Sequence, residues 1–249
     1  MGPAKTAGGR TTSGKTGRFS GPRPGLVAGC PGHRFRVSNG FARREPPCMK
    51  IKSALFDTSA PDLKSCPPSA LPEFAFIGRS NVGKSSLINL LAERRELAKV
   101  SVTPGKTKLI NFFTMNDTWS LVDLPGYGYA SVGQQRRDEF NQSVSDYLQK
   151  RKNIFCVFVL IDSRLPPQPI DLQFVRWLAS VSVPFVLVFT KTDKQSAARS
   201  QVHIGRFRQT LAEGGVAVPE IFASSSKTKA GRADILGFIE STLAKNNRL

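Results

Sequence analysis

The sequence is poor in the residues that build metal centres and disulfide frameworks. It has two histidines and four cysteines, and the cysteines, at positions 30, 48, 66 and 156, show no C-x-x-C spacing. This pattern argues against a zinc site, and we interpret the cysteines as reduced thiols of a cytoplasmic protein. The longest purely apolar run, residues 154–161, is far shorter than the ~20 residues that cross a bilayer. No apolar segment typical of a signal peptide follows the N-terminus, so we expect neither export nor a membrane partner.

Acidic side chains are also scarce, because 36 Lys and Arg residues face 18 Asp and Glu residues and give a formal charge of +18. This excess predicts attraction to polyanions, with RNA as the expected nucleic acid and no DNA partner expected. A basic protein without any polyanionic partner is the alternative. The length and the 40% hydrophobic content suit one α/β domain with tails, and we expect a monomer.

Residues 1–48 differ from the rest of the chain in composition. They hold nine Lys or Arg residues against one acidic residue, Glu45, and sixteen of them are Gly or Pro. Such a segment buries too little apolar surface to offset the entropy of ordering it, so we expect a basic, disordered tail. A myristoylation pattern at Gly2 and a composition shared with transit peptides are two further interpretations. Translation that starts at Met49 is another, which would make the tail an artefact of the chosen start site.

From residue 73 onward the sequence alternates strand and helix patterns. Apolar runs predict strands at 73–77, 154–162, 184–190 and 220–223, and helical apolar spacing predicts helices at 85–99, 137–152, 169–180, 196–213 and 234–245. The segments 108–115 and 118–122 predict an antiparallel hairpin. This alternation predicts a three-layer α/β/α sandwich with a mainly parallel sheet of six to seven strands and one antiparallel hairpin. We assign 49–72 to an N-terminal strand and lead-in, and 73–249 to one domain.

Two octapeptides match the phosphate-loop pattern G-x-x-x-x-G-K-[ST]: GRTTSGKT at 9–16 and GRSNVGKS at 78–85. In such a loop, backbone N–H groups surround phosphate oxygens, the Lys reaches the outer phosphates and the Ser or Thr hydroxyl ligates magnesium. The loop needs an apolar strand before it and a helix after it. No apolar strand precedes Gly9, and Gly and Pro interrupt every turn after Thr16, so we interpret the first match as a coincidence.

The second octapeptide has both supports and predicts nucleotide-binding residues. They are Gly78, Arg79, Ser80, Asn81, Val82, Gly83, Lys84 and Ser85. We assign to Lys84 the neutralisation of charge on the β- and γ-phosphates, and to Ser85 a place among the magnesium ligands.

A phosphate loop does not distinguish ATP from GTP, but the sequence TKTD after strand 184–190 does. The carboxylate of Asp193 can accept two hydrogen bonds from guanine N1 and N2, donors that adenine lacks. The stem of Lys191 would lie along the base and ribose. The predicted base-binding residues are Thr190, Lys191, Thr192 and Asp193, together with Ser224, Ser225 and Ser226, whose backbone N–H groups are suited to guanine O6. A solvated polar turn is the alternative interpretation of TKTD.

The sequence DLPG at 123–126 fits D-x-x-G at the end of a strand. Asp123 would hold magnesium through water, and the N–H of Gly126 would meet the γ-phosphate. Thr107 lies between the first helix and the hairpin, where its hydroxyl could ligate magnesium in the triphosphate state. The nucleotide-binding residues predicted here are Gly105, Lys106, Thr107, Lys108, Leu109, Asp123, Leu124, Pro125 and Gly126, and the candidate catalytic residues are Lys84, Thr107 and Gly126.

Together these segments resemble the EngB-type (YihA/YsxC) GTPases of the translation-factor-related (TRAFAC) class of P-loop GTPases. The resemblance is carried by PEFAFIGRSNVGKSSLIN (72–89), TPGKTK (103–108), LVDLPGYGYA (121–130), DSR (162–164), FTKTDK (189–194) and SSSKTKAG (224–231). It spans about residues 49–246, and 1–48 have no counterpart in it. It implies the P-loop GTPase fold, Mg-dependent binding and hydrolysis of GTP, a role in assembling the large ribosomal subunit, and a need in normal cell division and septation.

Two positions bear on the rate of hydrolysis. In many Ras-like GTPases a Gln after D-x-x-G orients the attacking water, but here that residue is Tyr127. We therefore predict slow intrinsic turnover that a partner or an ion completes. Asn81 is similar to the Asn that potassium-activated GTPases of this class use to hold K⁺, and its alternative role is to shape the turn.

Two other functions are compatible with parts of the sequence. An ATP-using P-loop protein would account for the phosphate loop, but not for the guanine acceptor at Asp193. A basic RNA-binding module with vestigial nucleotide binding would account for the charge, and its RNA affinity would be indifferent to GTP.

Overall fold

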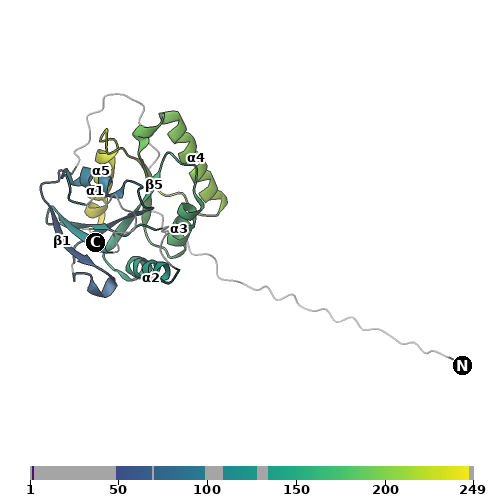
Figure 1. Cartoon of the computed structure of the whole chain (residues 1–249), viewed down its shortest axis with the longest axis horizontal. Coiled ribbons are helices and arrows are strands. Elements are labelled where there is room, and N and C mark those ends of the chain that lie inside the picture. The colour runs from purple at the N-terminus through teal and green to yellow at the C-terminus, as the bar shows by residue number, and fades with distance from the viewer. Residues whose placement is uncertain (1, 3–48, 69, 99–108, 128–133, 247–249) are drawn as a thin grey trace. The chain divides into compact units, whose positions relative to one another are not determined.

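The computed structural model describes residues 2, 49–68, 70–98, 109–127 and 134–246, with the backbone alone for 134–141. The elements in chain order are β1 (Ala54–Ala60), the 3-10 helix η1 (Leu63–Ser65), β2 (Glu73–Gly78), α1 (Lys84–Ala92), β3 (Ile110–Met115), β4 (Trp119–Asp123), α2 (Gln134–Lys150), β5 (Ile154–Asp162), α3 (Pro169–Ser180), β6 (Phe185–Thr190), the 3-10 helix η2 (Thr192–Lys194), α4 (Ala197–Glu213), β7 (Ile221–Ala223) and α5 (Arg232–Asn246) (Figure 1). Among these described residues, no helix combines the length and the hydropathy that a bilayer span requires.

The strands form one seven-stranded sheet in the order β1-β3-β4-β2-β5-β6-β7. β2 pairs in parallel with β4 and β5, and the parallel pairing continues through β6 to β7. β3 pairs antiparallel with β4, which confirms the predicted hairpin, and also with β1, which adds a second antiparallel pair. The expectation of a mainly parallel sheet with six to seven strands is confirmed.

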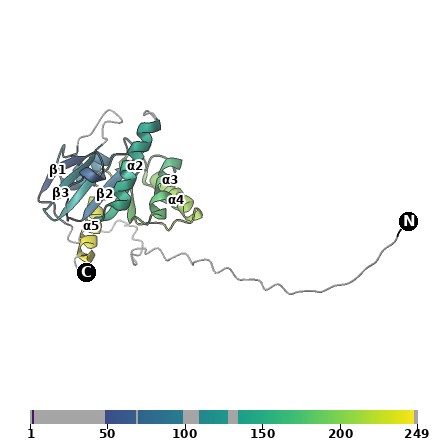
Figure 2. The ribbon, with the colours of Figure 1, turned by 90° about the horizontal axis from the view of Figure 1, so that it is seen from below.

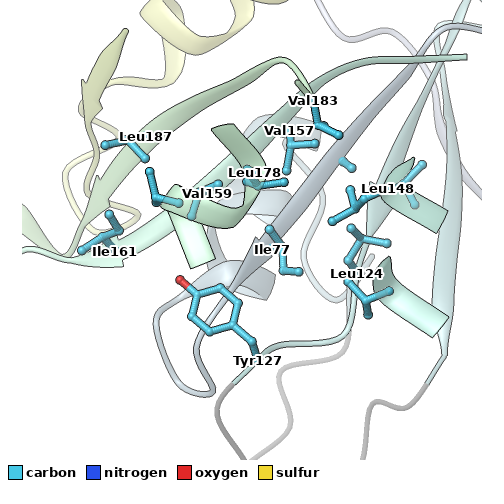
Figure 3. Close-up of a cluster of buried hydrophobic side chains, with 14 of the residues drawn as sticks. Ile77, Leu124, Tyr127, Leu148, Val157, Val159, Ile161, Leu178, Val183 and Leu187 are labelled. Carbon is cyan, nitrogen blue, oxygen red and sulfur yellow. The ribbon is translucent and has the colours of Figure 1, made fainter. Parts of the chain in front are cut away.

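Helices cover both faces of the sheet, because alternate residues of the central strand enter two separate clusters. Phe74 and Phe76 of β2 lie in the cluster that α1 and α5 line. Ala75 and Ile77 lie in the other cluster, which α2, α3 and α4 line and which Figure 3 shows in part. Figure 1 shows α1 next to α5, and Figure 2 shows α2, α3 and α4 beside one another. β2 is the central strand of the sheet, so the phosphate loop that follows it leaves from the middle of the sheet's carboxyl edge.

The first helix is shorter than its apolar spacing predicted. It was expected over 85–99 but ends at Ala92, where Glu93 adopts a left-handed conformation with φ 52°. The side chain of Arg232 donates hydrogen bonds to the carbonyls of Leu90 and Leu91, each at 3.0 Å. The last carbonyls of a helix have no partner within it, so Arg232 stabilises this early end.

A buried ion pair anchors the end of β2 that lies opposite the phosphate loop. Glu73 has no exposed surface. Its carboxylate accepts hydrogen bonds from Tyr147 Oη at 2.6 Å, Arg151 Nη2 at 2.6 Å and Asn153 Nδ2 at 2.9 Å. Because a buried carboxylate is tolerated only when it is paired and hydrogen-bonded, this cluster fixes the C-terminal end of α2 to the sheet.

Candidate functional site

The motifs predicted from the sequence gather at one edge of the sheet. Gly78 ends β2, Asp123 ends β4, Asp162 ends β5, Thr190 ends β6 and Ala223 ends β7. Because parallel strands present their carboxyl ends on the same side, the loops that follow them meet in one place. This is the position at which open α/β sheets bind ligands.

The segment that contains Thr107 lies outside the described residues, together with Gly105, Lys106 and Lys108. Leu109 is the first described residue after it and precedes β3 with an exposed side chain. The other matching octapeptide, at 9–16, also lies outside the described residues. The role predicted for Thr107 therefore stays a prediction.

The second octapeptide turns from β2 directly into the N-terminus of α1. Gly83 precedes the helix with φ 105°, a conformation that favours glycine, and it supplies no capping side chain. Its carbonyl accepts the first helical hydrogen bond, from Leu87 N at 2.9 Å. The amide groups of the first turn, which include those of Lys84 and Ser85, are therefore not capped from Gly83. An uncapped helix N-terminus at the end of a glycine-rich loop is suited to an anion such as phosphate.

Lys84 and Asp123 meet across the site. Lys84 Nζ forms an ion pair with Asp123 Oδ1, and the two side chains are 12% and 6% exposed. Burial lowers the pKa of Lys84 to about 7. The Lys84 ammonium is removed from water and paired with one carboxylate. Phosphate oxygens placed beside it would stabilise its charged form.

The donor set fits magnesium bound together with phosphates. A hydroxyl, from Ser85, follows Lys84 directly, and Asp123 supplies a carboxylate within reach of Lys84. Across the described ranges, the structure holds no group of three or more His, Cys, Asp or Glu side chains that could cage a metal ion. Magnesium does not need one, because it keeps several waters and binds through one or two protein oxygens plus substrate phosphates.

The two loops predicted to bind the base lie against each other. Thr192 N and Thr192 Oγ1 both donate hydrogen bonds to the carbonyl of Ser224, at 3.3 and 3.2 Å. Ser225 Oγ donates to Asp193 Oδ1 at 2.7 Å. This hydrogen bond lowers the pKa of Asp193. An ionised carboxylate held beside the loop of Ser224, Ser225 and Ser226 is the acceptor that guanine N1 and N2 require.

Lys191 connects this base-binding region to the phosphate loop. Its Nζ donates to the carbonyl of Asn81 at 2.6 Å and to Asp162 Oδ2 at 2.9 Å. Arg164 also binds Asp162, with Nη2 at 2.7 Å from Oδ2. Burial would raise the pKa of Asp162, but the hydrogen bonds from Arg164 and Lys191 lower it to about 2. Asp162 was part of the resemblance but carried no predicted role, and the structure gives it one, as the anion that orients Lys191.

The side chains of Arg79, a predicted site residue, and of Tyr127, which follows the predicted site residue Gly126, both point toward α3. Arg79 Nε lies 3.0 and 3.1 Å from the two carboxylate oxygens of Asp171. Tyr127 Oη donates to Asp171 Oδ1 at 2.9 Å. The side chain of Arg79 is thus engaged with Asp171, so the nucleotide contact predicted for this residue would be made by its backbone. Sequence reasoning missed Asp171, since an Asp in the first turn of a helix is explained by the helix dipole alone.

Comparisons with known proteins agree with this arrangement. A family model described as "50S ribosome-binding GTPase" matches residues 73–191. The "Probable GTP-binding protein EngB" of Christiangramia forsetii is 50% identical over 192 residues, which cover 77% of this chain and 97% of the relative. The protein of the same name from Bacteroides thetaiotaomicron is 50% identical over 192 residues, with 77% and 95% covered. The chain belongs to the EngB family of GTP-binding proteins. It is therefore a GTPase.

The solved structures agree on the fold. A crystal structure of a probable GTP-binding protein engB superposes with a TM-score of 0.58 at 21% identity, covering 70% of this chain and 99% of the other. At this identity the likeness supports the P-loop GTPase fold alone. The EngB family membership rests on the sequence relatives.

Nucleotide binding should be accompanied by proton uptake above pH 7. Because burial lowers the pKa of Lys84 to about 7, a fraction of the free protein carries a neutral Lys84 at higher pH. Phosphates raise that pKa, so binding takes up a proton, and GDP affinity should fall by at most about tenfold per pH unit as pH rises above 7. Calorimetry of GDP binding above pH 7, in buffers with different ionisation enthalpies, measures the uptake.

Variants of two lysines provide the controls. Lys84→Arg keeps its charge at every pH, so any residual binding should show no buffer dependence. Lys84→Ala should abolish binding, and Lys15→Ala, in the other octapeptide, should leave it unchanged. A wild-type binding enthalpy that is the same in all buffers would contradict a neutral Lys84 in the free protein, and GDP binding that survives in Lys84→Ala would contradict the assignment of Lys84 to the phosphates.

Asp193→Asn should exchange the base preference. The amide replaces one acceptor with a donor, which suits the O2 carbonyl of xanthine and leaves guanine N2 unpaired, so GDP should bind about 100-fold more weakly and xanthosine diphosphate more tightly. Competition between the two nucleotides measures the ratio of affinities. Ser225→Ala removes the partner of Asp193 but keeps the carboxylate, so it should weaken binding while the guanine preference remains. An unchanged preference in Asp193→Asn would refute the assignment.

Proposed function

We propose that the chain is a magnesium-dependent, slow GTPase that acts as a nucleotide switch in the assembly of the large ribosomal subunit and is needed for normal cell division and septation. The observation that carries the proposal is that two groups of side chains lie at the same edge of the sheet. Lys84 with Asp123 is suited to phosphate, and Asp193 with Ser225 is suited to guanine. The ribosomal part is supported by the description of the matching family model and by the formal charge of +18, which suits rRNA.

The proposed roles of individual residues are those that the sequence motifs predict. Lys84 neutralises charge on the outer phosphates, and the N–H of Gly126 contacts the γ-phosphate. Ser85 and Thr107 supply hydroxyl ligands for Mg²⁺, and Asp123 holds it through water. When bound, Mg²⁺ neutralises charge that develops on the phosphates. The remaining nucleotide contacts come from the predicted loops around these residues, with Asp193 selecting guanine.

Slow intrinsic turnover is supported by the orientation of Tyr127. The residue is 6% exposed and its hydroxyl donates a hydrogen bond to Asp171. It therefore does not reach a water at the γ-phosphate, so a partner or an ion supplies what a Gln would supply in Ras-like GTPases.

The proposed boundaries are those of the sequence analysis. Residues 73–249 form the GTP-binding domain, 49–72 the N-terminal strand and lead-in, and 1–48 a basic tail. The presence of β1, residues 54–60, supports the assignment of an N-terminal strand to 49–72. We further propose that the protein is a cytoplasmic monomer.

Binding to ribosomal particles should depend on the nucleotide. If the protein is a switch, its affinity for large-subunit particles in the presence of a non-hydrolysable GTP analogue should exceed that with GDP by about tenfold, and the particles should raise its affinity for the analogue by the same factor. Co-sedimentation with purified particles measures the first quantity. Nucleotide titration with and without particles measures the second. Equal affinity in both nucleotide states would favour the basic RNA-binding module over the switch.

Potassium dependence distinguishes the two roles of Asn81. Its φ of 60° is one that Asn adopts more readily than most residues, which suits a turn-shaping role, while its exposed side chain is available to an ion. If Asn81 holds K⁺, GTP hydrolysis should be about tenfold faster in KCl than in NaCl, and Asn81→Asp should alter this ratio. Equal rates of GTP hydrolysis in both salts would refute the K⁺ role, and Asn81 would then only shape the turn.

A further inference from the structure

A buried cluster joins the phosphate loop, the D-x-x-G segment and helix α3. Its centre is Asp171, which has no exposed surface. The same oxygen, Asp171 Oδ1, accepts hydrogen bonds from Tyr127 Oη at 2.9 Å and from Arg79 Nε at 3.0 Å. The ring of Tyr127 also stacks on Phe174, with centroids 4.4 Å apart. Figure 3 shows Tyr127 at the margin of the hydrophobic cluster, beyond Ile77. The phosphate loop and the D-x-x-G segment are thus both fixed to one carboxylate of α3.

The cluster fixes the backbone next to Gly126. Arg79 and Tyr127 form a parallel β-bridge, which extends the pairing of β2 with β4 beyond the strand ends. Leu124 N donates to the carbonyl of Phe76 at 3.0 Å within the same run. Gly126 lies so close to the phosphate loop that a Cβ there would be 2.6 Å from Gly78 O. The position of Gly126 is therefore bounded by a strand on one side and by the anchored Tyr127 on the other.

We propose that Asp171 is a positioning residue for GTP hydrolysis: through Tyr127 and Arg79 it holds Gly126 against the phosphate loop, where the Gly126 N–H is pre-organised for the γ-phosphate. This inference rests on the proposed function, in which Gly126 contacts that phosphate. Pre-organised donors act most strongly where charge develops during the reaction. The cluster should therefore affect the hydrolysis step more than ground-state binding, and it should leave GDP, which has no γ-phosphate, unaffected.

The same chain contains a matched control for this cluster. At the opposite end of β2, Tyr147 Oη donates to Glu73 Oε2 at 2.6 Å, and Arg151 binds the same carboxylate. Both clusters combine a buried tyrosine, a fully buried carboxylate and an arginine. They differ in location, since the Glu73 cluster lies at the strand end away from the phosphate loop. Loss of one tyrosine hydroxyl should thus cost similar stability in both, and only the Asp171 cluster should affect turnover.

The experiment compares the full-length wild type with Tyr127→Phe, Tyr147→Phe, Asp171→Asn and Asp171→Ala. Steady-state GTP hydrolysis gives kcat and KM, GDP titration gives Kd, and thermal unfolding gives Tm. Tyr127→Phe should lower kcat about tenfold and change KM and the GDP Kd by less than about twofold. Tyr147→Phe should lower Tm by about as much as Tyr127→Phe does, and it should leave kcat at the wild-type value.

The Asp171 variants test the hydrogen-bonding role directly. The amide oxygen of Asp171→Asn can replace Oδ1, which accepts from both Tyr127 and Arg79, but the variant loses the charge that pairs with Arg79 and the second acceptor, Oδ2, at 3.1 Å from Arg79 Nε. The kcat of Asp171→Asn should therefore lie between those of the wild type and Asp171→Ala. Asp171→Ala should lower kcat by about as much as is expected for Tyr127→Phe. If Asp171→Ala does not fold, the comparison of Tyr127→Phe with Tyr147→Phe decides.

Three outcomes would overturn the inference. They are wild-type kcat in Tyr127→Phe, equal loss of kcat in Tyr127→Phe and Tyr147→Phe, and a GDP Kd that rises as much as kcat falls. A wild-type protein that hydrolyses no GTP would remove the proposed function and the inference with it. Normal wild-type hydrolysis that Tyr127→Phe does not change would remove the inference alone.

Discussion

The burial of β2 on both faces is the constraint on which the site depends. Every residue from Glu73 to Gly78 is buried, with large rings toward α1 and α5 and smaller side chains toward α2, α3 and α4. A strand held in this way cannot shift its register without moving apolar side chains from one cluster to the other. The loop that leaves its carboxyl end therefore starts from a fixed point. Neighbouring parallel strands deliver Asp123, Asp162 and Thr190 to the same edge, so the positions of their side chains are fixed by the same packing.

Polar contacts between loops complete what the packing begins. Thr190 Oγ1 donates to the carbonyl of Val82 at 2.6 Å, and Lys191 donates to the carbonyl of Asn81. Three cations at the site each have an anionic partner from a different element: Lys84 has Asp123, Lys191 has Asp162 and Arg79 has Asp171. On the proposed roles, the carboxylate paired with Lys84 is the one that a bound nucleotide would share through magnesium. The other two pairs can hold the loops in place whether or not nucleotide is bound.

Much of this arrangement could be predicted from the sequence, because the supports of the motifs are local. Apolar runs identified the strands, and the chemistry of each motif at a strand end indicated its neighbours. What could not be predicted depends on contacts distant in sequence. Arg232 ends α1 from the start of α5, and Asp171 reaches Arg79 and Tyr127 from α3, none of which leaves a periodic signal. The substitution of Tyr127 for Gln could be identified, but the direction of its side chain could not, because a tyrosine at a turn fits either solvent or a buried acceptor.

The two tyrosine–carboxylate–arginine clusters show how location decides what such a group can do. At the Glu73 end, the partners join the sheet to the C-terminal end of α2, so we expect their hydrogen bonds to act on stability alone. At the Asp171 end, the same chemistry holds the residue that follows Gly126, one peptide away from a group suited to the γ-phosphate. A hydrogen bond to a buried carboxylate is strong because water cannot compete for it. On the proposed role of Gly126, Tyr127 would supply a rigid boundary for the backbone beside the γ-phosphate, in place of a side chain that orients water.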